Sequence, residues 1–181
     1  MTRFGYVIAA TLAVVGTAIP TIVPMPLRLV WNASASTPIG LYLVASGDAL
    51  DADDLVVVLP PEPILHFMVE RGYVGQGVPL LKHVAARSGQ VVCRRERSIR
   101  VDGALIGDAL DRDRQGRVLP IWQGCHRLSD GEIFVMNRNV RDSFDGRYFG
   151  VLPASSVIGR AIPSFTDEAG EGRFRWHAPT R

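Results

Sequence analysis

The chain has 181 residues, which is the length of one domain with a short appendage. Hydrophobic residues make up 47% and charged residues 21%, so a disordered protein is excluded and a globular core with an apolar surplus is indicated. The formal net charge is only +2, and the arginines are scattered rather than gathered into a basic stripe with aromatic residues. We therefore expect no nucleic acid as a partner.

The apolar surplus lies at the start of the chain. The 24 residues between Arg3 and Arg28 carry no charge, and about 20 apolar residues suffice for a helix to span the bilayer core. Three prolines between residues 20 and 26 should end or kink this helix near Ile19. We expect residues 1–29 to be an uncut N-terminal membrane anchor that contains a single transmembrane helix, with its amino end on the inner side.

A cleaved signal peptide is the alternative interpretation of this segment. Its best small-x-small cleavage match is Ala33-Ser34-Ala35, and a cut there would leave Ser36 as the new N-terminus. Such a cut would remove Asn32 and Ser34, and both belong to the motif described below.

Behind the anchor the pattern is mainly β, with one short helix. Strands are indicated by β-branched and apolar runs bounded by turn residues, which lie at residues 41–44, 54–60, 78–86, 90–96, 98–107, 131–137 and 156–163. The fifth run contains Asp102-Gly103 between two apolar stretches, which predicts a hairpin turn. Residues 61–71 are typical of a helix, because prolines occupy the first turn and a glycine follows the last. We predict a β-rich domain over residues 30–165 and a poorly ordered tail over 166–181.

The two cysteines, Cys93 and Cys125, have no C-x-x-C neighbour and no histidines at metal-ligand spacing. We therefore predict no metal site and no cofactor. In an oxidising space outside the inner membrane, the simplest expectation is that the two cysteines pair with each other. Two unpaired buried thiols remain the alternative, since spacing alone does not decide between them.

Lys82 is the single lysine in a chain that has 19 arginines. Lysine differs from arginine in that it can lose its proton inside a protein. Lys82 lies in the apolar run PLLKHVAA, and burial there would lower its pKa toward the range of a general base. The alternative is an exposed lysine on an edge strand, where it would discourage aggregation. The count of one lysine against 19 arginines favours a functional role.

A general base calls for a nucleophile, and the segment WNASASTPIGLY places two serines, Ser34 and Ser36, just after the apolar segment. Serine and lysine form a known nucleophile–base pair. The alternative base is histidine, but none of the four histidines lies in a recognisable nucleophile motif. His83 should also point away from Lys82 on a strand, so a serine–histidine–aspartate triad is the weaker hypothesis.

Residues 136–163, MNRNVRDSFDGRYFGVLPASSVIGRAIP, supply a third motif. This segment resembles the terminal signature of type I signal peptidases, a membrane-proximal family that uses a serine–lysine dyad. The segment WNASASTPIGLY resembles the pattern N-x-S/T-x-S-x-P-x-G-L-Y of the conjugative-transfer branch, the TraF-type peptidases. The matching residues are Asn32, Ser34, Ser36, Pro38, Gly40, Leu41 and Tyr42. The resemblance covers about residues 4–163 and implies a signal-peptidase-like, β-rich catalytic domain.

The chain departs from the family pattern in two loops. Where the family often has Pro-Gly-Asp after the lysine strand, this chain has residues 87–90, RSGQ. Where the family often has Asp-Ser-Arg-Tyr, Gly146 stands in place of the serine. Neither departure touches the dyad, but both affect how the loops around the site are braced.

The resemblance implies a role for each site residue. Ser36 would be the nucleophile and Lys82 its general base, and the oxyanion hole would combine the backbone N–H of Ser36 with the hydroxyl of Ser34. Pro38 and Gly40 would fix the turn and leave space for the substrate backbone. Three further residues would support the site: Ser143 would orient the lysine, and Asp145 and Arg147 would brace the site as an ion pair.

The expected function is that of a membrane-anchored serine endopeptidase that processes a secreted precursor. In the conjugative branch this implies pilin maturation, with hydrolysis and cyclisation of the product both open. The expected partners are the precursor, with its signal peptide or prepilin segment, and the membrane. The catalytic domain should face the periplasm from the bacterial inner membrane. A general type I signal peptidase and a non-catalytic periplasmic scaffold of a secretion apparatus are the alternatives.

Overall fold

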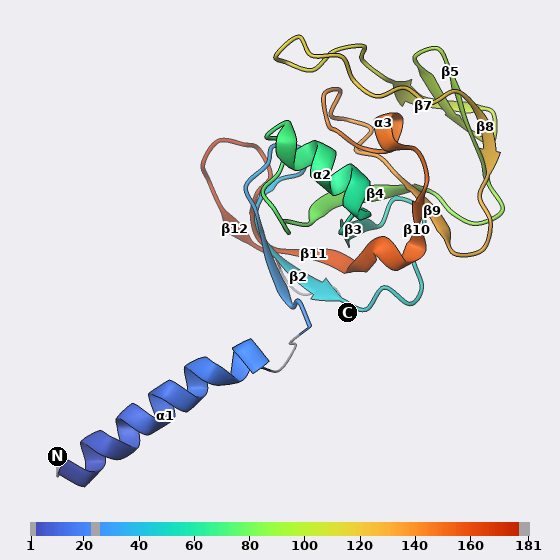
Figure 1. Cartoon of the computed structure of the whole chain (residues 1–181). Helices are drawn as coiled ribbons and strands as arrows, with labels where there is room; N and C mark the ends of the chain where they lie inside the picture. Colours follow the sequence, from blue (N-terminus) through green and yellow to red (C-terminus); the bar gives the residue numbers. More distant parts are fainter. Residues whose placement is uncertain (1–2, 23–25, 178–181) are drawn as a thin grey trace.

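The computed structural model of the protein describes residues 3–22 and 26–177. The first element is helix α1 (Arg3–Ile22), which stands apart from the β-rich body in Figure 1. Its described large apolar side chains, such as Phe4 and Leu12, are exposed. Among the described residues, no helix combines the length and the apolar character needed to cross a membrane. The transmembrane helix expected within the anchor over residues 1–29 is therefore not found among the described residues, although α1 forms there.

Most of the body is an antiparallel sheet of eight strands, and the mainly β prediction is confirmed. Side by side, its strands are β1 (Leu29–Asn32), β2 (Ile39–Ala45), β11 (Val157–Asp167), β3 (Leu55–Val58), β4 (Leu80–Ala86), β9 (Glu132–Val135) and β10 (Leu152–Pro153). The eighth strand, β12 (Arg175–Trp176), pairs with β11. β4 lies between β3 and β9, so the strand that carries the single lysine is an inner strand of this sheet rather than an edge.

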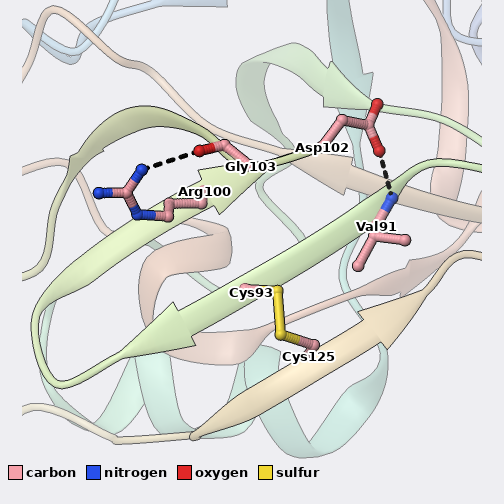
Figure 2. Close-up of a disulfide and its surroundings, with 6 residues drawn as sticks. All are labelled: Val91, Cys93, Arg100, Asp102, Gly103 and Cys125. Atoms are coloured by element: carbon pink, nitrogen blue, oxygen red, sulfur yellow. Dashed lines mark hydrogen bonds between the residues drawn. A yellow bond between two sulfur atoms is a disulfide. The ribbon is translucent and has the colours of Figure 1, made fainter.

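A second, smaller sheet extends from the body. Its order is β7 (Ala104–Asp108), β6 (Ser98–Val101), β5 (Val91–Arg95) and β8 (Gly124–Arg127). The hairpin predicted at Asp102-Gly103 joins β6 to β7, and both turn residues have positive φ, 49° and 84°. Such angles are those of a two-residue hairpin turn whose twist matches the strands. The Asp102 carboxylate also accepts the Val91 N–H at 2.8 Å, which ties the turn to β5 (Figure 2).

Three short helical elements complete the body. The predicted helix is α2 (Glu62–Glu70), which ends where expected. A second helix, α3 (Gly146–Phe149), and a 3-10 turn, η1 (Ala154–Ser156), were not predicted. α3 is a single turn, and the Asp145 side chain caps it by accepting the Arg147 N–H. It escapes sequence-based prediction because one turn is too short to show a periodic pattern.

In the tail expected to be poorly ordered over 166–181, residues 166–176 instead fold onto the body, and residues 178–181 lie outside the described part of the chain. β11 continues to Asp167, and β12 pairs with it through Phe165↔Trp176 and Thr166↔Arg175. Phe174 stacks on Trp31 with ring centroids 5.9 Å apart and on Phe165 at 5.3 Å. The alternation of aromatic and arginine residues in RFRW is the signal that was missed, because it is too short to stand out as a strand.

The core joins the two sheets and holds β4 in place. One cluster packs small-sheet residues Val92 and Ile99 against Ala85, Phe134 and neighbours in the large sheet. A second cluster packs β3, β4 and β9 side chains, all of them almost fully buried, against residues of β10. The first cluster includes Ala85 of β4 and the second includes Val84 of β4, so the strand that carries the single lysine is packed into the core.

Gly40 has a role in this packing that differs from the one expected. It was expected to leave space for a substrate backbone, but the space is filled by β11. A Cβ built on Gly40 would lie 2.7 Å from the Thr166 Cα and closer still to the Phe165 carbonyl oxygen, at a φ of 149°. Glycine is therefore required here for the close approach of two strands rather than for ligand access.

Candidate active site

The turn between β1 and β2 carries the two serines, and Asn32 holds it together. The Asn32 side chain is buried and its Nδ2 donates to Thr37 Oγ1 at 2.7 Å and to the Ser34 carbonyl at 2.8 Å. Its Oδ1 accepts the Ser34 N–H at 3.0 Å. One side chain thus bonds both ends of a six-residue turn, as asparagine often does in turns. The turn presents Ser36 half-buried and Ser34 exposed.

The hydroxyl oxygens of Ser34 and Ser36 lie 3.1 Å apart. Ser34 Oγ donates to Asn32 Oδ1 at 2.9 Å, so the hydroxyl proton of Ser36 is the one free to be shared between the two serines. In this arrangement Ser34 is held beside Ser36, with its hydroxyl turned toward Asn32.

Lys82 is the third of the seven residues of β4, and the residue is 4% exposed. Burial lowers the pKa of its ammonium group to about 8, while the nearby Asp145 carboxylate raises it and the Arg147 guanidinium lowers it further. Lys82 Nζ donates to Ser143 Oγ at 2.6 Å. Because the amine is neutral at pH values above about 8, Lys82 is suited to accept a proton from a nearby group under mildly alkaline conditions.

The segment from Ser143 to Arg147 is braced by a buried ion pair. Asp145 and Arg147 are 0% and 1% exposed at the side chain, and Arg147 Nη2 lies 2.8 Å from Asp145 Oδ2. Arg147 also donates to the carbonyl oxygens of Val140 at 2.7 Å and of Arg141 at 3.1 Å. With these bonds the guanidinium folds the segment back on itself and holds Ser143 against Lys82.

The glycine that departs from the family pattern has a physical reason. A Cβ on Gly146 would lie 2.6 Å from the Phe134 ring and 2.7 Å from the Val135 carbonyl oxygen. The Phe134 ring is itself fully buried and cannot move aside without opening the core. A serine at position 146 would therefore clash with both the Phe134 ring and the Val135 backbone, and a smaller residue at position 134 alone would not make room for it.

A groove with a volume of about 780 Å³ brings the predicted residues together. Ser34, Ser36, Lys82 and Ser143 line it, and apolar residues such as Leu29 and Leu80 continue its wall. Asp145 and Arg147 lie behind Ser143 rather than on the surface of the groove. The structure thus assembles at one place a candidate nucleophile, a buried amine and the two serines predicted to assist them.

The histidines do not assemble a competing site. Among the described residues, no histidine lines the groove. The His83 ring contacts the Asp53 carbonyl oxygen through Nδ1 at 2.9 Å, and His126 pairs with Glu132 at 2.8 Å. The described part of the chain also holds no group of three or more histidine, cysteine or acidic side chains that could bind a metal ion.

Two residues beyond the predicted set belong to this site. Asn32 was noted as part of the serine motif but was given no role, and Asn137 was not singled out at all. Asn137 is buried, and its side chain contacts both the Ser36 carbonyl and β4. The available signal for Asn137 was a polar residue ending the apolar run IFVM, which is also what an ordinary strand end looks like.

The two cysteines lie apart from the groove, in the small sheet. Cys93 of β5 and Cys125 of β8 face each other in the strand register and form a disulfide, with Cα atoms 4.0 Å apart (Figure 2). The bridge joins residues 32 apart in sequence. It fastens β8, whose four residues are all exposed, to the better-buried β5.

The site and the fold together define the class of protein. A family model described as "Signal peptidase, peptidase S26" matches residues 1–165, and the chain therefore belongs to the S26 family of signal peptidases. The chain is similar to the plasmid transfer protein TraF of Escherichia coli, with 31% identity over 70% of this chain and 76% of the relative. It is also similar to the conjugal transfer protein TraF of Agrobacterium fabrum, with 33% identity over 75% and 81%. The resemblance to TraF-type signal peptidases is confirmed.

Two further matches complete the comparison. A probable signal peptidase I-1 of Synechocystis is 30% identical over 62% of this chain and 53% of that protein. A crystal structure of a signal peptidase I from Enterococcus faecalis is 19% identical, with a TM-score of 0.38, and the match covers 64% of this chain and 98% of that one.

Proposed function

We propose that the chain is a serine endopeptidase in which Ser36 is the nucleophile and neutral Lys82 its general base. The observation that carries the proposal is a buried lysine with a pKa near 8 in a groove that Ser36 and Ser34 also line. Lysine is rare as a buried group, and burial with a lowered pKa at a groove is typical of functional sites.

In the proposed reaction Ser36 Oγ attacks the scissile carbonyl while Lys82 Nζ takes the hydroxyl proton. The tetrahedral intermediate collapses to an ester on Ser36, and the protonated Lys82 gives its proton to the departing amine. Water, or the amine of the substrate itself, then attacks the ester and releases Ser36. The first outcome is hydrolysis and the second is cyclisation, and both use the same groups.

The proposed substrate is a secreted precursor, and pilin maturation in conjugative transfer is the favoured case. The support is the similarity to relatives named as plasmid and conjugal transfer proteins, at 31–33% identity. A general type I signal peptidase is the second candidate, favoured by the similarity to the Synechocystis protein. The two differ in breadth: the first should cut one precursor and the second many.

The proposed location is the outer face of the bacterial inner membrane, with the body in the periplasm. A disulfide between Cys93 and Cys125 suits an oxidising compartment. Residues 1–29 are proposed to hold the protein at the membrane, because the described part of α1 exposes a row of large apolar side chains. The groove lies at the end of this segment, because Leu27 and Leu29 of the segment also line the groove.

The test is a cleavage assay with the full chain and a membrane-inserted prepilin. We expect the wild type to cut the precursor once, and Ser36→Ala to leave it intact while its thermal unfolding stays unchanged. Ser88→Ala, an exposed serine far along the chain, serves as the control and should cut normally. Cleavage by the Ser36→Ala variant at the wild-type rate would exclude the proposed nucleophile. A folded wild type that cuts no precursor would favour the scaffold alternative.

Ser34→Ala should lower kcat by about 100- to 1,000-fold, because its hydroxyl stabilises charge that develops only in the transition state. KM should change little, since an interaction absent from the ground state does not affect substrate binding. Steady-state kinetics on a soluble peptide substrate measures both constants. A loss confined to KM would assign Ser34 to substrate binding instead.

A further inference from the structure

Asn137 stands where three segments of the site meet. It follows β9, and its side chain is almost completely buried. Its Nδ2 donates to the Ser36 carbonyl at 2.8 Å and to the Leu81 carbonyl at 3.2 Å, and its Oδ1 accepts the His83 N–H at 3.1 Å. Both amide protons and the amide oxygen are therefore used.

The contacts with β4 have the form of strand pairing. β9 pairs with β4 through Val84↔Val135, and Met136 N donates to the His83 carbonyl at 2.8 Å. At the next position the side-chain amide of Asn137 replaces the backbone as the hydrogen-bonding partner of β4. It accepts the N–H of His83 and donates to the C=O of Leu81. These two groups flank Lys82, so the amide is hydrogen-bonded to the backbone on both sides of the candidate base.

The remaining amide proton reaches the serine turn. In the part of the chain that the structure describes, no other hydrogen bond joins residues 33–37 to β4 or to residues 137–147. The Ser36 turn is organised from within by Asn32, which sets its shape but not its place relative to β4. The strand pairing of β1 and β2 places the turn within the sheet, and the contact between Asn137 and the Ser36 carbonyl is the direct hydrogen bond that links the turn to the surroundings of β4.

Asn137 is itself held firmly. Its backbone N–H donates to Asp145 Oδ2 at 3.0 Å, and Asp145 is locked by Arg147. The buried ion pair thus fixes Ser143, which binds Lys82 Nζ, and Asn137, which binds the backbone around Lys82 and Ser36. One rigid support reaches both candidate catalytic residues.

We infer that Asn137 is a positioning residue that sets the distance and angle between Ser36 and Lys82. The inference rests on the proposed function, because it assigns Asn137 a part in the same reaction. Proton transfer requires the two groups at hydrogen-bond reach, and a displacement of about 1 Å in an active site can cost about 100-fold in rate. The buried amide of Asn137 meets this requirement, because it links the carbonyl of Ser36 to the strand that carries Lys82.

The experiment measures kcat and KM on the precursor for the full chain carrying Asn137→Ala, Asn137→Asp or Asn139→Ala. Asn137→Ala removes all three bonds. Asn137→Asp keeps the shape and the acceptor for His83 N–H but loses both donors. Asn139 is exposed and lies two residues along the same segment, so Asn139→Ala is the matched control. We expect both changes at 137 to lower kcat by about 10- to 100-fold with KM within about 2-fold, and the control to match wild type.

A second readout separates positioning from collapse of the pocket. Lysine labelled with ¹³C at Cε gives one side-chain signal, because the chain has one lysine. The charged groups near Lys82 are Asp145 and Arg147; Asn137→Ala changes neither of them and adds no charge, whereas Asn137→Asp adds a carboxylate beside the Lys82 backbone, so the titration is read on Asn137→Ala alone. Asn137→Ala should therefore leave the titration of Lys82 near its wild-type midpoint while kcat falls. A titration moved toward that of free lysine would mean that the pocket has opened, and would overturn the positioning role.

The two hypotheses fail in different ways. If wild type cuts the precursor and Asn137→Asp does so with the wild-type kcat, the positioning role is wrong and the proposed function stands. If Ser36→Ala cuts as well as wild type, or wild type does not cut at all, the proposed function is wrong and the role of Asn137 falls with it. Both variants at 137 are assayed well below their measured unfolding temperatures.

Discussion

Lys82→Arg is expected to abolish processing while the protein remains folded. Arginine stays protonated at all accessible pH values, so it cannot accept the Ser36 proton. The loss should be at least about 10³-fold in kcat, because nucleophile and base act as one unit. The measurement is single-turnover cleavage, with the exposed Arg95→Lys exchange on β5 as the matched control. Appreciable turnover by Lys82→Arg would rule out lysine as the base.

The same lysine predicts the pH dependence of the wild type. Because the base must be neutral, kcat/KM should rise with pH and level off above the Lys82 pKa of about 8. The single ¹³C-labelled lysine signal should titrate with the same midpoint. An activity profile that stays flat between about pH 6 and 10 would show that Lys82 does not take part in the rate-limiting proton transfer.

Lys82→Met is expected to stabilise the fold as it destroys activity. The folded-state pKa is lower than the unfolded-state value, so Lys82 disfavours folding fully at pH values below about 8 and not at all above the unfolded pKa of 10.5. At about 1.4 kcal/mol per pKa unit, the cost at pH 7 is at most about 3–4 kcal/mol. Methionine has a similar shape and carries no charge, so urea unfolding at pH 7 should show a gain that shrinks toward pH 10.

Removing one partner of the Asp145–Arg147 pair should have the largest effect on stability. Both side chains are buried, and Arg147→Met would leave the Asp145 carboxylate without its cation. An unpaired buried charge of this kind costs about 3–5 kcal/mol. The loss should appear as a lower urea midpoint and, through Ser143 and Asn137, as lost cleavage even where the protein stays folded.

The control for this prediction is an exposed pair in the same chain. Arg173 pairs with Glu171 near the C-terminal strand, with both side chains more than half exposed. Arg173→Met should change the unfolding free energy by less than about 1 kcal/mol. A loss of similar size at both positions would mean that burial is not what makes the Asp145–Arg147 pair costly to break.

The elements that could be predicted are those whose signal is local. β3 is an unbroken apolar run, β4 is apolar apart from Lys82 and His83, and the Asp102-Gly103 turn needs only two residues to be recognised. β8 was missed because all four of its residues are exposed, and its pairing with β5 depends on a cysteine 32 residues away. The transmembrane helix was inferred from an uncharged run, but absence of charge is a weaker property than the hydropathy that a spanning helix needs.

The same distinction between local signals and long-range contacts applies to the residues of the site. Ser36 and Lys82 could be found because one lies in a motif and the other is unique by type. Asn137 could not be, because its importance comes from a contact with Ser36 across 101 positions of the chain. Such a contact leaves no pattern in either segment, and only the fold shows which polar residue at a strand end faces the reacting groups.

The solitary amine has a consequence for inhibitor chemistry. Acylating and reductively alkylating reagents react with neutral amines, and a chain with 19 arginines and one lysine offers them only Lys82 and the N-terminus. At neutral pH a larger share of Lys82 is unprotonated than of an ordinary lysine, because burial lowers its pKa to about 8. An electrophile small enough to enter the groove, such as an activated ester or an ortho-hydroxyaldehyde, would therefore modify this protein at one internal position. Covalent reagents for this protein can thus be aimed at Lys82 Nζ rather than at a serine hydroxyl.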